Sequence, residues 1–412
     1  MQFAIDATPI LPGRKGLGIF LEQVIHQIHL RFQVSPLIYV DTCFFSEAKK
    51  RWPSLTFRSV WAKPSSFWEK YGLPLCIRKD KVSILFTGRD RTLLEPLCRT
   101  VVYLFEIPDY RQNALLNGNA SWYEKVSIRI SRKQFQKTTR SVTKFITSSF
   151  STQKDLEFRY QVAANRIATV YPGVDPVFQP AADHNQRMRA RGRFAKGQKY
   201  VLHFATGDVR DNTEVALRAF QDSLTSIPKD IHLLLAGVPL SIESVLNQEV
   251  KKFGLKDRIS TVRFLRGNDL VMAYQGAEAY LDPTLYEGFG FQNLEAMACG
   301  VPVISSSVTS VPEIVGQAGL LYSPDDISGF SAGLRSILNN PKIAEELKKK
   351  GLEQAKQFTW SWCTDRILSV IEEELCKGSV IARSPKGDEA IPSEIASATF
   401  GTLPRNDEGF NR

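Results

Sequence analysis

The feature that most constrains the fold is a series of short apolar runs separated by helix-like segments, and this series occurs twice. Runs rich in β-branched and aromatic residues cover 3–7, 36–40, 82–86, 100–105, 143–147 and 167–171. A second set covers 199–204, 232–237, 260–265, 277–282 and 301–305. Such runs are typical of strands buried on both faces of a parallel sheet. The two series predict an α/β protein with two doubly wound, Rossmann-like domains.

The length of 412 residues is also typical of two domains. We expect a first domain over 1–180, a polar linker over 181–197 and a second domain over 198–360. A closing helix is predicted over 361–376, and we expect it to pack back on the first domain. Gly, Pro and Ser are scattered without period over 377–412, which predicts a disordered tail.

The composition, with 43% hydrophobic and 23% charged residues, is that of a globular protein that folds in water. We find no apolar run long enough to span a membrane, and the start of the sequence does not have the pattern of a secretory signal. The six cysteines are far apart in sequence and form no C-x-x-C pair, which predicts reduced thiols in a cytoplasmic protein.

The net charge of +10 is concentrated in the first part of the chain. Residues 1–180 hold 26 Lys and Arg against 14 Asp and Glu, whereas 181–376 hold 22 against 24. The last 36 residues hold five of each. A basic half indicates an anionic partner, such as a phosphorylated ligand, a membrane surface or nucleic acid.

The stretch from Asp282 to Pro302, DPTLYEGFGFQNLEAMACGVP, holds the strongest candidate site. A strand ends at Asp282, a glycine-containing loop follows, and a helix is predicted from about Phe291. Free N–H groups at a helix start attract anions, and ligands bind at this edge of an open parallel sheet. Glu287 in the loop and Glu295 in the helix can both reach that edge. The alternative is a glycine-rich connector whose Glu side chains face solvent.

Two motifs in this region resemble a known family. YEGFGFQNLEAMACGVPVISS and SVPEIVGQAGLLYSPDD are similar to the signature of the retaining, GT-B-fold glycosyltransferases of family 4, also called glycosyl transferases group 1. Glu287 and Glu295 match the family's E-x7-E pair. Weaker resemblances, FITSSFSTQKDL and VYPGVDPVF among them, extend over most of 1–376. The resemblance implies two Rossmann-like domains that face each other across a cleft.

The resemblance also implies roles for the residues of the motif. Glu287 would lie near the transferred sugar and would be the residue most closely tied to catalysis. Glu295 would hold the ribose hydroxyls of a nucleotide sugar, because a carboxylate can accept two hydrogen bonds from a diol. Donor oxygens would be bound by the loop that contains Gly288 and by the backbone N–H groups of Phe289, Gly290 and Phe291.

A second donor element is the turn ATGDVRDN after the run 199–204. In the family this turn usually ends in Arg-Lys-Asn and neutralises the leaving diphosphate; here Arg210, Asp211 and Asn212 occupy those positions. Thr206 replaces a residue that is sometimes basic. Arg210 is therefore the leading catalytic cation, with Arg263 and Arg266 as further candidates. The alternative is that Asp211 caps the next helix and pairs with Arg210.

Glycines at 13, 16 and 18 lie between the first strand and the first helix. In the family this loop brings backbone against the donor diphosphate or the acceptor, which implies such a role for Gly16 and Gly18. A dinucleotide site is the alternative, but no acidic residue ends a second strand at the expected distance.

The run 100–105 leads into the acceptor side. Many family members have His-Asp after this strand, with the His near the transferred sugar. This sequence has Phe105 and Glu106 at the two positions. We therefore expect Glu106 to make a polar contact there, or the acceptor pocket to be different.

Residues 125–140 contain six basic residues and no acidic one. On a helix, Arg129, Arg132, Lys133 and Lys137 would lie on one face, with Ile128 and Phe135 elsewhere. This pattern is typical of a contact with an anionic membrane surface, and a solvated helix face is the alternative. Nucleic acid fits less well, because no binding motif accompanies the charge.

The resemblance implies a retaining hexosyltransferase, with mannosyl transfer as one example that is frequent in the family, and we expect it to need neither cofactor nor metal. Its donor would be a UDP- or GDP-sugar and its acceptor a saccharide or lipid-linked saccharide in surface polysaccharide synthesis. We expect it in the cytoplasm or peripherally on the inner face of the membrane. Two alternatives stay open: a degenerate GT-B protein that binds nucleotide or acts as a scaffold, and an epimerase on the same fold.

Overall fold

The computed structural model describes residues 2–11, 16–31, 35–89, 97–109 and 122–381. The chain divides into two compact units. The first unit comprises Met1–Tyr103, Arg140–Phe145 and the chain from Thr364 onward, and the second unit comprises Leu104–Thr139 and Ile146–Cys363. The predicted tail beyond residue 381 and the predicted role of Gly13 lie outside the described residues.

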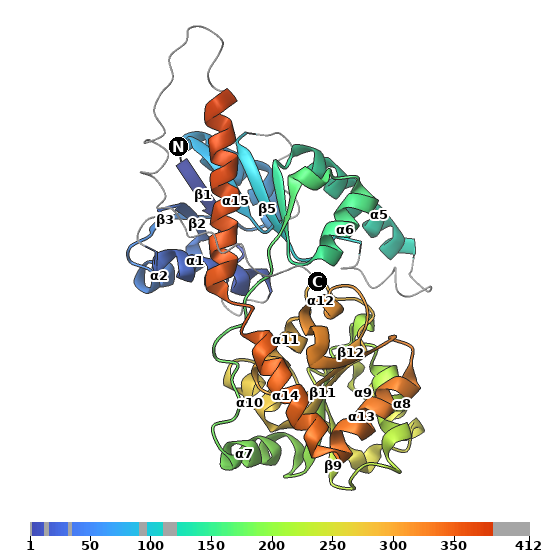
Figure 1. Ribbon diagram of the computed structural model, residues 1–412. Helices are drawn as coiled ribbons and strands as arrows, with labels where there is room; N and C mark the ends of the chain where they lie inside the picture. Colours follow the sequence, from blue (N-terminus) through green and yellow to red (C-terminus); the bar gives the residue numbers. More distant parts are fainter. Residues whose placement is uncertain (1, 12–15, 32–34, 90–96, 110–121, 382–412) are drawn as a thin grey trace, which may run out of the picture. The chain divides into compact units, whose positions relative to one another are not determined.

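The first sheet has seven strands in the order β3-β2-β1-β4-β5-β6-β7 (Figure 1). Its strands are β1 Gln2–Asp6, β2 Leu37–Asp41, β3 Thr56–Val60, β4 Val82–Thr87, β5 Arg99–Leu104, β6 Lys144–Thr147 and β7 Ile167–Thr169. From β3 through β5 every pairing is parallel. The strand order reverses direction between β1 and β4, as in doubly wound nucleotide-binding folds.

The second sheet repeats this arrangement with six parallel strands in the order β10-β9-β8-β11-β12-β13. Its strands are β8 Lys199–Phe204, β9 Ile231–Ala236, β10 Ile259–Thr261, β11 Ala277–Asp282, β12 Val303–Ser306 and β13 Gly319–Tyr322. The order reverses between β8 and β11. The loops after these two strands are therefore where a doubly wound fold binds its ligand.

Alternate residues of the second sheet enter different apolar cores, which is why its strands are almost continuously apolar. Tyr200 and Leu202 of β8 belong to one core. Val201, between them, belongs to a core with Leu233 and Leu235 of β9. Helices cover both faces, as the prediction of two doubly wound domains requires.

The α-helices of the first unit and of the segments around β6 are α1 Leu17–His29, α2 Thr42–Arg51, α3 Ser65–Phe67, α4 Leu73–Lys79, α5 Trp122–Ser141 and α6 Phe150–Tyr160. A π-helical turn, η1 Trp68–Gly72, joins α3 to α4. The later helices are α7 His184–Ala195, α8 Thr213–Ser223, α9 Leu240–Lys252, α10 Asn268–Gly276, α11 Phe291–Ala298, α12 Val311–Val315, α13 Ile327–Asn339, α14 Pro341–Ala355 and α15 Trp360–Ile381.

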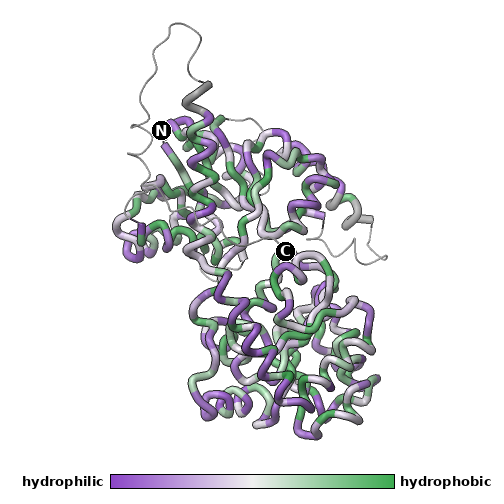
Figure 2. The backbone as a smooth tube through the Cα atoms, viewed as in Figure 1, coloured by the Kyte–Doolittle hydropathy of each residue, from purple (hydrophilic) through white to green (hydrophobic). Residues whose placement is uncertain are grey.

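The segment predicted as a linker, 181–197, contains helix α7. The side chain of Asp183 caps its N-terminus by accepting from the N–H of Gln186 at 2.7 Å. Figure 2 draws this helix mostly in purple, and three of its apolar side chains, Ala190, Phe194 and Ala195, are buried in the core beside β8, whereas Met188 is exposed. A stripe this narrow gives too weak an apolar period to be recognised in sequence.

Helix α15 is longer than the closing helix predicted over 361–376. From Thr364 onward its residues belong to the first unit. Arg31 donates to Asp365 at 2.8 Å, and Arg99 at the start of β5 donates to the carbonyl of Glu374. Residues 377–381, which were predicted as part of the disordered tail, continue the helix.

Candidate functional site

The central element of the site is the connection from β11 to α11. As predicted, the helix begins at Phe291. Gly290 has a φ of 89°, a left-handed conformation that favours glycine. Asp282, at the end of β11, is buried and accepts from Asn293 Nδ2 at 2.7 Å and from Ser305 Oγ at 3.3 Å. This carboxyl group therefore ties the end of the strand to the helix and to β12.

Glu287 is held by its backbone. Its N–H donates to Thr309 Oγ1 at 3.0 Å and its carbonyl accepts from Ser310 Oγ at 2.8 Å. Thr309 has a φ of 51°, a rare conformation for a β-branched residue and one that is found mainly at functional sites. Burial, and then the charge of Asp282, raise the pKa of Glu287 well above its ordinary value. Burial therefore favours the protonated form of the Glu287 side chain.

Glu295, in the second turn of α11, accepts from Tyr274 Oη at 2.9 Å. Tyr274 belongs to α10 and is buried among Phe178, Phe204 and Tyr280. Burial raises the pKa of Glu295 to about 8, although the hydrogen bond from Tyr274 acts in the opposite direction. Sequence reasoning missed Tyr274, because an aromatic residue in an apolar helix gives no sign that its hydroxyl holds a carboxyl group.

Three hydroxyl groups fix the orientation of the peptide between Gly288 and Phe289. The carbonyl of Gly288 accepts from Ser149 Oγ at 2.8 Å, from Ser148 Oγ at 3.0 Å and from Thr152 Oγ1 at 3.3 Å. Because a trans peptide is planar, the N–H of Phe289 points away from these hydroxyls. The first turn of α11 begins two residues later, and such a turn offers N–H groups without intrahelical partners. Their contact with the donor stays a prediction.

Arg210, in the turn after β8, is bound by carboxylates on two sides. Its Nη1 contacts Glu106 Oε2 at 2.9 Å, and its Nη2 contacts Asp208 Oδ2 at 2.8 Å. Burial alone would raise the pKa of Asp208, but the hydrogen bonds from Arg210 lower it below its ordinary value. The Arg210 carbonyl also accepts from the N–H of Leu285 at 3.0 Å. The turn is therefore attached to the loop that contains Glu287.

Asp211 neither caps α8 nor pairs with Arg210, as the alternative interpretation of this turn required. Its Oδ2 accepts instead from the N–H and the Oγ1 of Thr206 at 2.6 and 2.8 Å. Burial raises the pKa of Asp211 to about 6, against those two hydrogen bonds. The carboxyl group closes the turn from Thr206 to Asp211, a local bond that sequence alone could not distinguish from a cap.

Asn212 adopts a left-handed conformation with a φ of 51°. Its side-chain amide donates to the carbonyls of Pro283 and Pro324, both at 2.8 Å. These bonds join the turn to the loop after β11 and to the segment after β13. The contact of Asn212 with the donor stays a prediction.

The other two basic candidates have partners elsewhere. Arg263 pairs with Glu243 at 3.8 Å, and Arg266 lies over the ring of Phe264 at 4.8 Å. Arg210 is thus the candidate cation that the structure brings to the loop of Glu287.

Phe105 and Glu106 lie directly after β5, as predicted. The ring of Phe105 is 5.9 Å from that of Phe291, and Phe289 packs against Phe291 at 4.9 Å. Phe289 is buried, so its ring belongs to the core and only its backbone is available to a ligand. Glu106 accepts from Arg210 Nη1 at 2.9 Å, and its role on the acceptor side stays a prediction.

Gly16 and Gly18 belong to the first unit. Gly16 precedes α1 with a φ of 45°, and Gly18 is buried in the first turn of that helix. Their contact with donor or acceptor stays a prediction.

Helix α5 differs in one respect from the predicted basic face. Arg132 is half-buried and pairs with Asp109, a buried carboxylate that also accepts from Tyr160. Arg129, Lys133 and Lys137 are exposed, and Phe135 is buried. The exposed basic face therefore excludes Arg132, because a buried acid from outside the helix attracts it, and a helical wheel cannot show such a partner.

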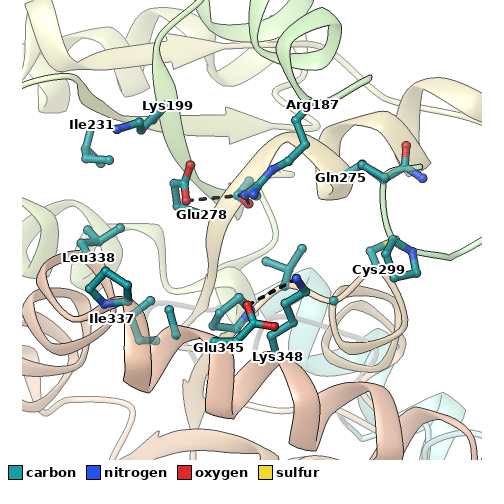
Figure 3. Close-up of a pocket in the computed structure, with 18 of the residues that line it drawn as sticks. Arg187, Lys199, Ile231, Gln275, Glu278, Cys299, Ile337, Leu338, Glu345 and Lys348 are labelled. Carbon is teal, nitrogen blue, oxygen red and sulfur yellow. Dashed lines mark hydrogen bonds and ion pairs between the residues drawn. The ribbon is translucent and has the colours of Figure 1, made fainter. Parts of the chain in front are cut away.

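A separate cavity of about 350 Å³ lies at the opposite end of the second sheet. Lys199, Ile231 and Ala277, at the starts of β8, β9 and β11, contribute to its wall. In Figure 3 four of its charged side chains lie in two pairs, Arg187 with Glu278 and Lys348 with Glu345. The cavity therefore lies away from the loops of the candidate site, which follow the other ends of the strands.

Within the described ranges, His, Cys, Asp and Glu side chains nowhere gather in a group of three or more that could hold a metal ion. In the same part of the chain, none of the helices combines the length and apolar character needed to cross a bilayer.

The two doubly wound sheets form the fold of the GT-B glycosyltransferases. The candidate site lies at the switch point of the second sheet. HepE of Anabaena, solved in complex with UDP and glucose, covers 90% of this chain over all of its own length, with a TM-score of 0.69 and 15% identity. Within that class, residues 184–354 match the family model "Glycosyl transferases group 1" and form a domain of that family.

Two curated relatives from Escherichia coli are similar to parts of the chain. The O-antigen chain mannosyltransferase B is 30% identical over 248 residues, 60% of this chain and 65% of the relative. The serotype-specific mannosyltransferase WbdA is 25% identical over 221 residues, 53% of this chain and 27% of the relative. The chain thus spans less than two thirds of the length of these relatives.

Proposed function

We propose that this protein is a retaining glycosyltransferase of family 4. It would transfer a hexosyl group, with mannosyl as the first choice, from a UDP- or GDP-sugar to a saccharide or lipid-linked saccharide in surface polysaccharide synthesis. The observation that carries the proposal is the placement of Glu287, Glu295 and Arg210 around the loop and helix start at the switch point of the second sheet. The names of the two relatives, both mannosyltransferases, support the choice of sugar.

In this proposal the nucleotide binds along α11. Glu295, held by Tyr274, accepts hydrogen bonds from the ribose hydroxyls. The N–H groups of Phe289, Gly290 and Phe291 bind sugar or phosphate oxygens, because the first turn of a helix offers unpaired donors and a positive dipole end. Arg210 counters the charge that develops on the leaving diphosphate, without help from a metal.

Glu287 would act on the transferred sugar. Burial raises the pKa of Glu287 and so favours its protonated form, and a protonated carboxyl group can donate a hydrogen bond as well as accept one. We propose that Glu287 donates to the sugar or to the leaving phosphate oxygen. The acceptor hydroxyl would attack from the same face as the leaving diphosphate, so that the anomeric configuration is retained.

The first experiment is a transfer assay with UDP-, GDP- and ADP-sugars, followed by NMR of the anomeric configuration of the product. We expect Glu287→Ala to reduce turnover at least about 100-fold, which corresponds to a few kcal/mol of transition-state stabilisation. Glu243→Ala serves as the control, since Glu243 is exposed and pairs only weakly with Arg263. Unchanged turnover in Glu287→Ala contradicts the site, and an inverted product contradicts the retaining mechanism.

We further propose that α5 brings the enzyme to an anionic membrane on its inner face, where a lipid-linked acceptor would be found. Its exposed Arg129, Lys133 and Lys137 support this, since each basic residue near an anionic surface contributes about 1 kcal/mol. Replacing the three by Gln should weaken binding to phosphatidylglycerol vesicles. Binding equal to that of the wild type would refute this contact.

The contacts of Asp211 and Arg210 favour one alternative. Asp211 closes a turn where the family usually has a cation, and Arg210 is already paired with two carboxylates. A protein that keeps the fold and binds nucleotide without transfer fits these contacts. Calorimetry with UDP and GDP, run beside the transfer assay, separates the two: binding without turnover of any donor favours the alternative.

A further inference from the structure

The segment from Trp61 to Lys79 in the first unit carries apolar side chains on two faces. Trp68, Leu73 and Ile77 are each 2% exposed and pack into a core with Ala4, Tyr39 and Leu85. These inward residues already attach the segment to the sheet. An ordinary surface helix would be polar on its other face.

The outer face has instead a stripe of large apolar residues, which we call the 61–75 stripe. It consists of Trp61, Phe67, Tyr71 and Leu75, which are 79%, 56%, 49% and 64% exposed. The last three are four residues apart along α3, η1 and α4. A π turn has more residues per turn than an α turn, so side chains at this spacing lie more nearly in line. The rings of Phe67 and Tyr71 are 5.3 Å apart.

The charge around the stripe is positive. Lys63, Lys70, Arg78 and Lys79 are exposed, and Lys70 lies over the ring of Tyr71 at 5.1 Å. Glu69, the acidic residue of the segment, and Asp80, which directly follows the segment, both face inward. Glu69 pairs with Arg89 at 2.7 Å, and Asp80 pairs with Arg58 and accepts from Tyr39 at 2.8 Å. A partner would therefore meet aromatic rings surrounded by cations.

We propose that the 61–75 stripe inserts into the headgroup region of an anionic lipid bilayer. Trp and Tyr prefer that region, Phe and Leu reach the acyl boundary, and lysine side chains extend toward the phosphates. A protein partner would meet the same apolar area, but exposed lysines are depleted at protein interfaces. The charges therefore favour the lipid.

One further contact connects the stripe to the ligand edge of the first sheet. Arg89, the partner of Glu69, also binds the buried Asp6 at 3.1 Å and Thr8 Oγ1 at 2.8 Å. Asp6 ends β1, and Arg89 follows β4, so this cluster lies at the switch point of the sheet. The inference thus deepens the proposed function, since lipid contact at the stripe would bring a lipid-linked acceptor to that edge.

The test is cosedimentation of the full chain with vesicles of phosphatidylcholine, with and without phosphatidylglycerol. We expect the wild type to bind the anionic vesicles, and the triple variant Phe67→Ser, Tyr71→Ser, Leu75→Ser to bind at least about tenfold more weakly. These side chains are exposed, so circular dichroism and thermal unfolding should match the wild type. A matched control is Leu240→Ser, Val245→Ser, Phe264→Ser, which removes equally exposed apolar residues from the second unit.

Three results would overturn the inference. They are wild-type protein that binds neither kind of vesicle, a stripe variant that binds as well as the wild type, and a dimer in solution that only the stripe variant loses. Vesicle binding requires no donor, so it can fail while transfer to a water-soluble acceptor succeeds. The variant of α5 distinguishes the two surfaces. If the α5 variant loses vesicle binding while the stripe variant binds fully, the membrane contact belongs to α5 alone.

Discussion

At the scale of single residues, the site is a group of carboxyl groups around one arginine. Glu106 and Asp208 contact Arg210 directly, and the charge of Arg210 also acts on the carboxyl group of Asp211. In the proposed function, a nucleoside diphosphate would compete with these groups for the guanidinium. We therefore expect the affinity for the donor to depend on how easily the carboxylates release Arg210.

Glu106 offers a direct test of this competition. Glu106→Gln removes one charge and keeps the shape, so we expect UDP or GDP to bind about three- to tenfold more tightly, as judged by calorimetry. The corresponding change at the exposed Glu214, which pairs with Arg218 on α8, should leave the affinity unchanged. Weaker binding in Glu106→Gln would mean that Glu106 holds Arg210 in its productive position.

Glu295 predicts a pH dependence. Its pKa of about 8 in the free protein means that it binds a proton near pH 7, whereas the role at the ribose requires the carboxylate. Nucleotide binding should then release a proton, and the affinity should rise between pH 6 and pH 8 by up to about tenfold per unit. Calorimetry in buffers of different ionisation enthalpy measures the release.

Glu295→Gln should flatten this profile, and a wild-type affinity independent of pH would contradict the assignment. The stability of the fold changes with pH in the opposite direction to the nucleotide affinity. Because folding raises the pKa of Glu295, the bound proton stabilises the fold most below the unfolded value. That contribution is lost as the pH rises through about 8. Urea unfolding of the wild type against Glu295→Gln measures it.

At the scale of elements, the loop between β11 and α11 is held from several sides. A Cβ on Gly288 would lie 2.3 Å from the carbonyl oxygen of Phe105, so Gly288→Ala must displace the loop. We expect transfer to fall at least about tenfold while the fold is retained, because small displacements of catalytic groups cost large factors in rate.

The control for this variant is Gly192→Ala in α7, where a Cβ meets nothing within 4 Å. It should leave transfer unchanged and stabilise the fold by about 0.5–1 kcal/mol. Transfer rates and thermal unfolding of both variants check the pair. Full activity in Gly288→Ala would show that the loop tolerates movement.

Most strands could be predicted from the sequence, and the two that were missed share a cause. β3 and β13 lie at sheet edges, and their sequences, TFRSV and GLLY, lack a long apolar run. Inner strands are buried on both faces and are therefore apolar throughout, whereas edge strands need not be.

The candidate site was predictable where it follows the backbone pattern. The start of α11 at Phe291 follows from the strand and glycines before it. The contacts of Thr309 and Ser310 with Glu287, and of Tyr274 with Glu295, connect residues 21 to 23 positions apart. Such pairs depend on how the elements pack, and a single sequence contains no signal for them.

At the scale of the whole molecule, charge is distributed unevenly along the chain. The excess of basic residues lies within 1–180, while 181–376 are nearly neutral. In the proposed function, the second sheet binds the nucleotide sugar with backbone N–H groups and Arg210. This binding does not need the excess of basic residues in 1–180. The surplus is available for an anionic acceptor or membrane surface.

This distribution predicts different salt sensitivities for two binding events. Raising the ionic strength from 0.1 to 1 M shortens the Debye length from about 10 to about 3 Å. Binding to anionic vesicles should weaken strongly over this range, whereas binding of the nucleotide, which contacts half-buried groups directly, should change much less. Cosedimentation measures vesicle binding and calorimetry measures nucleotide binding at matched salt concentrations. If both depend equally on salt, the basic excess is not reserved for an anionic acceptor or membrane surface.

The bond between Asp211 and Thr206 also restricts how this turn can change by mutation. Asp211→Lys would supply a cation where the resemblance to family 4 implies a lysine, but it would remove two hydrogen bonds that close the turn and leave the N–H of Thr206 without this acceptor. The two positions are therefore epistatic. A mutational path toward the basic form of the turn passes through a less stable intermediate unless position 206 changes first.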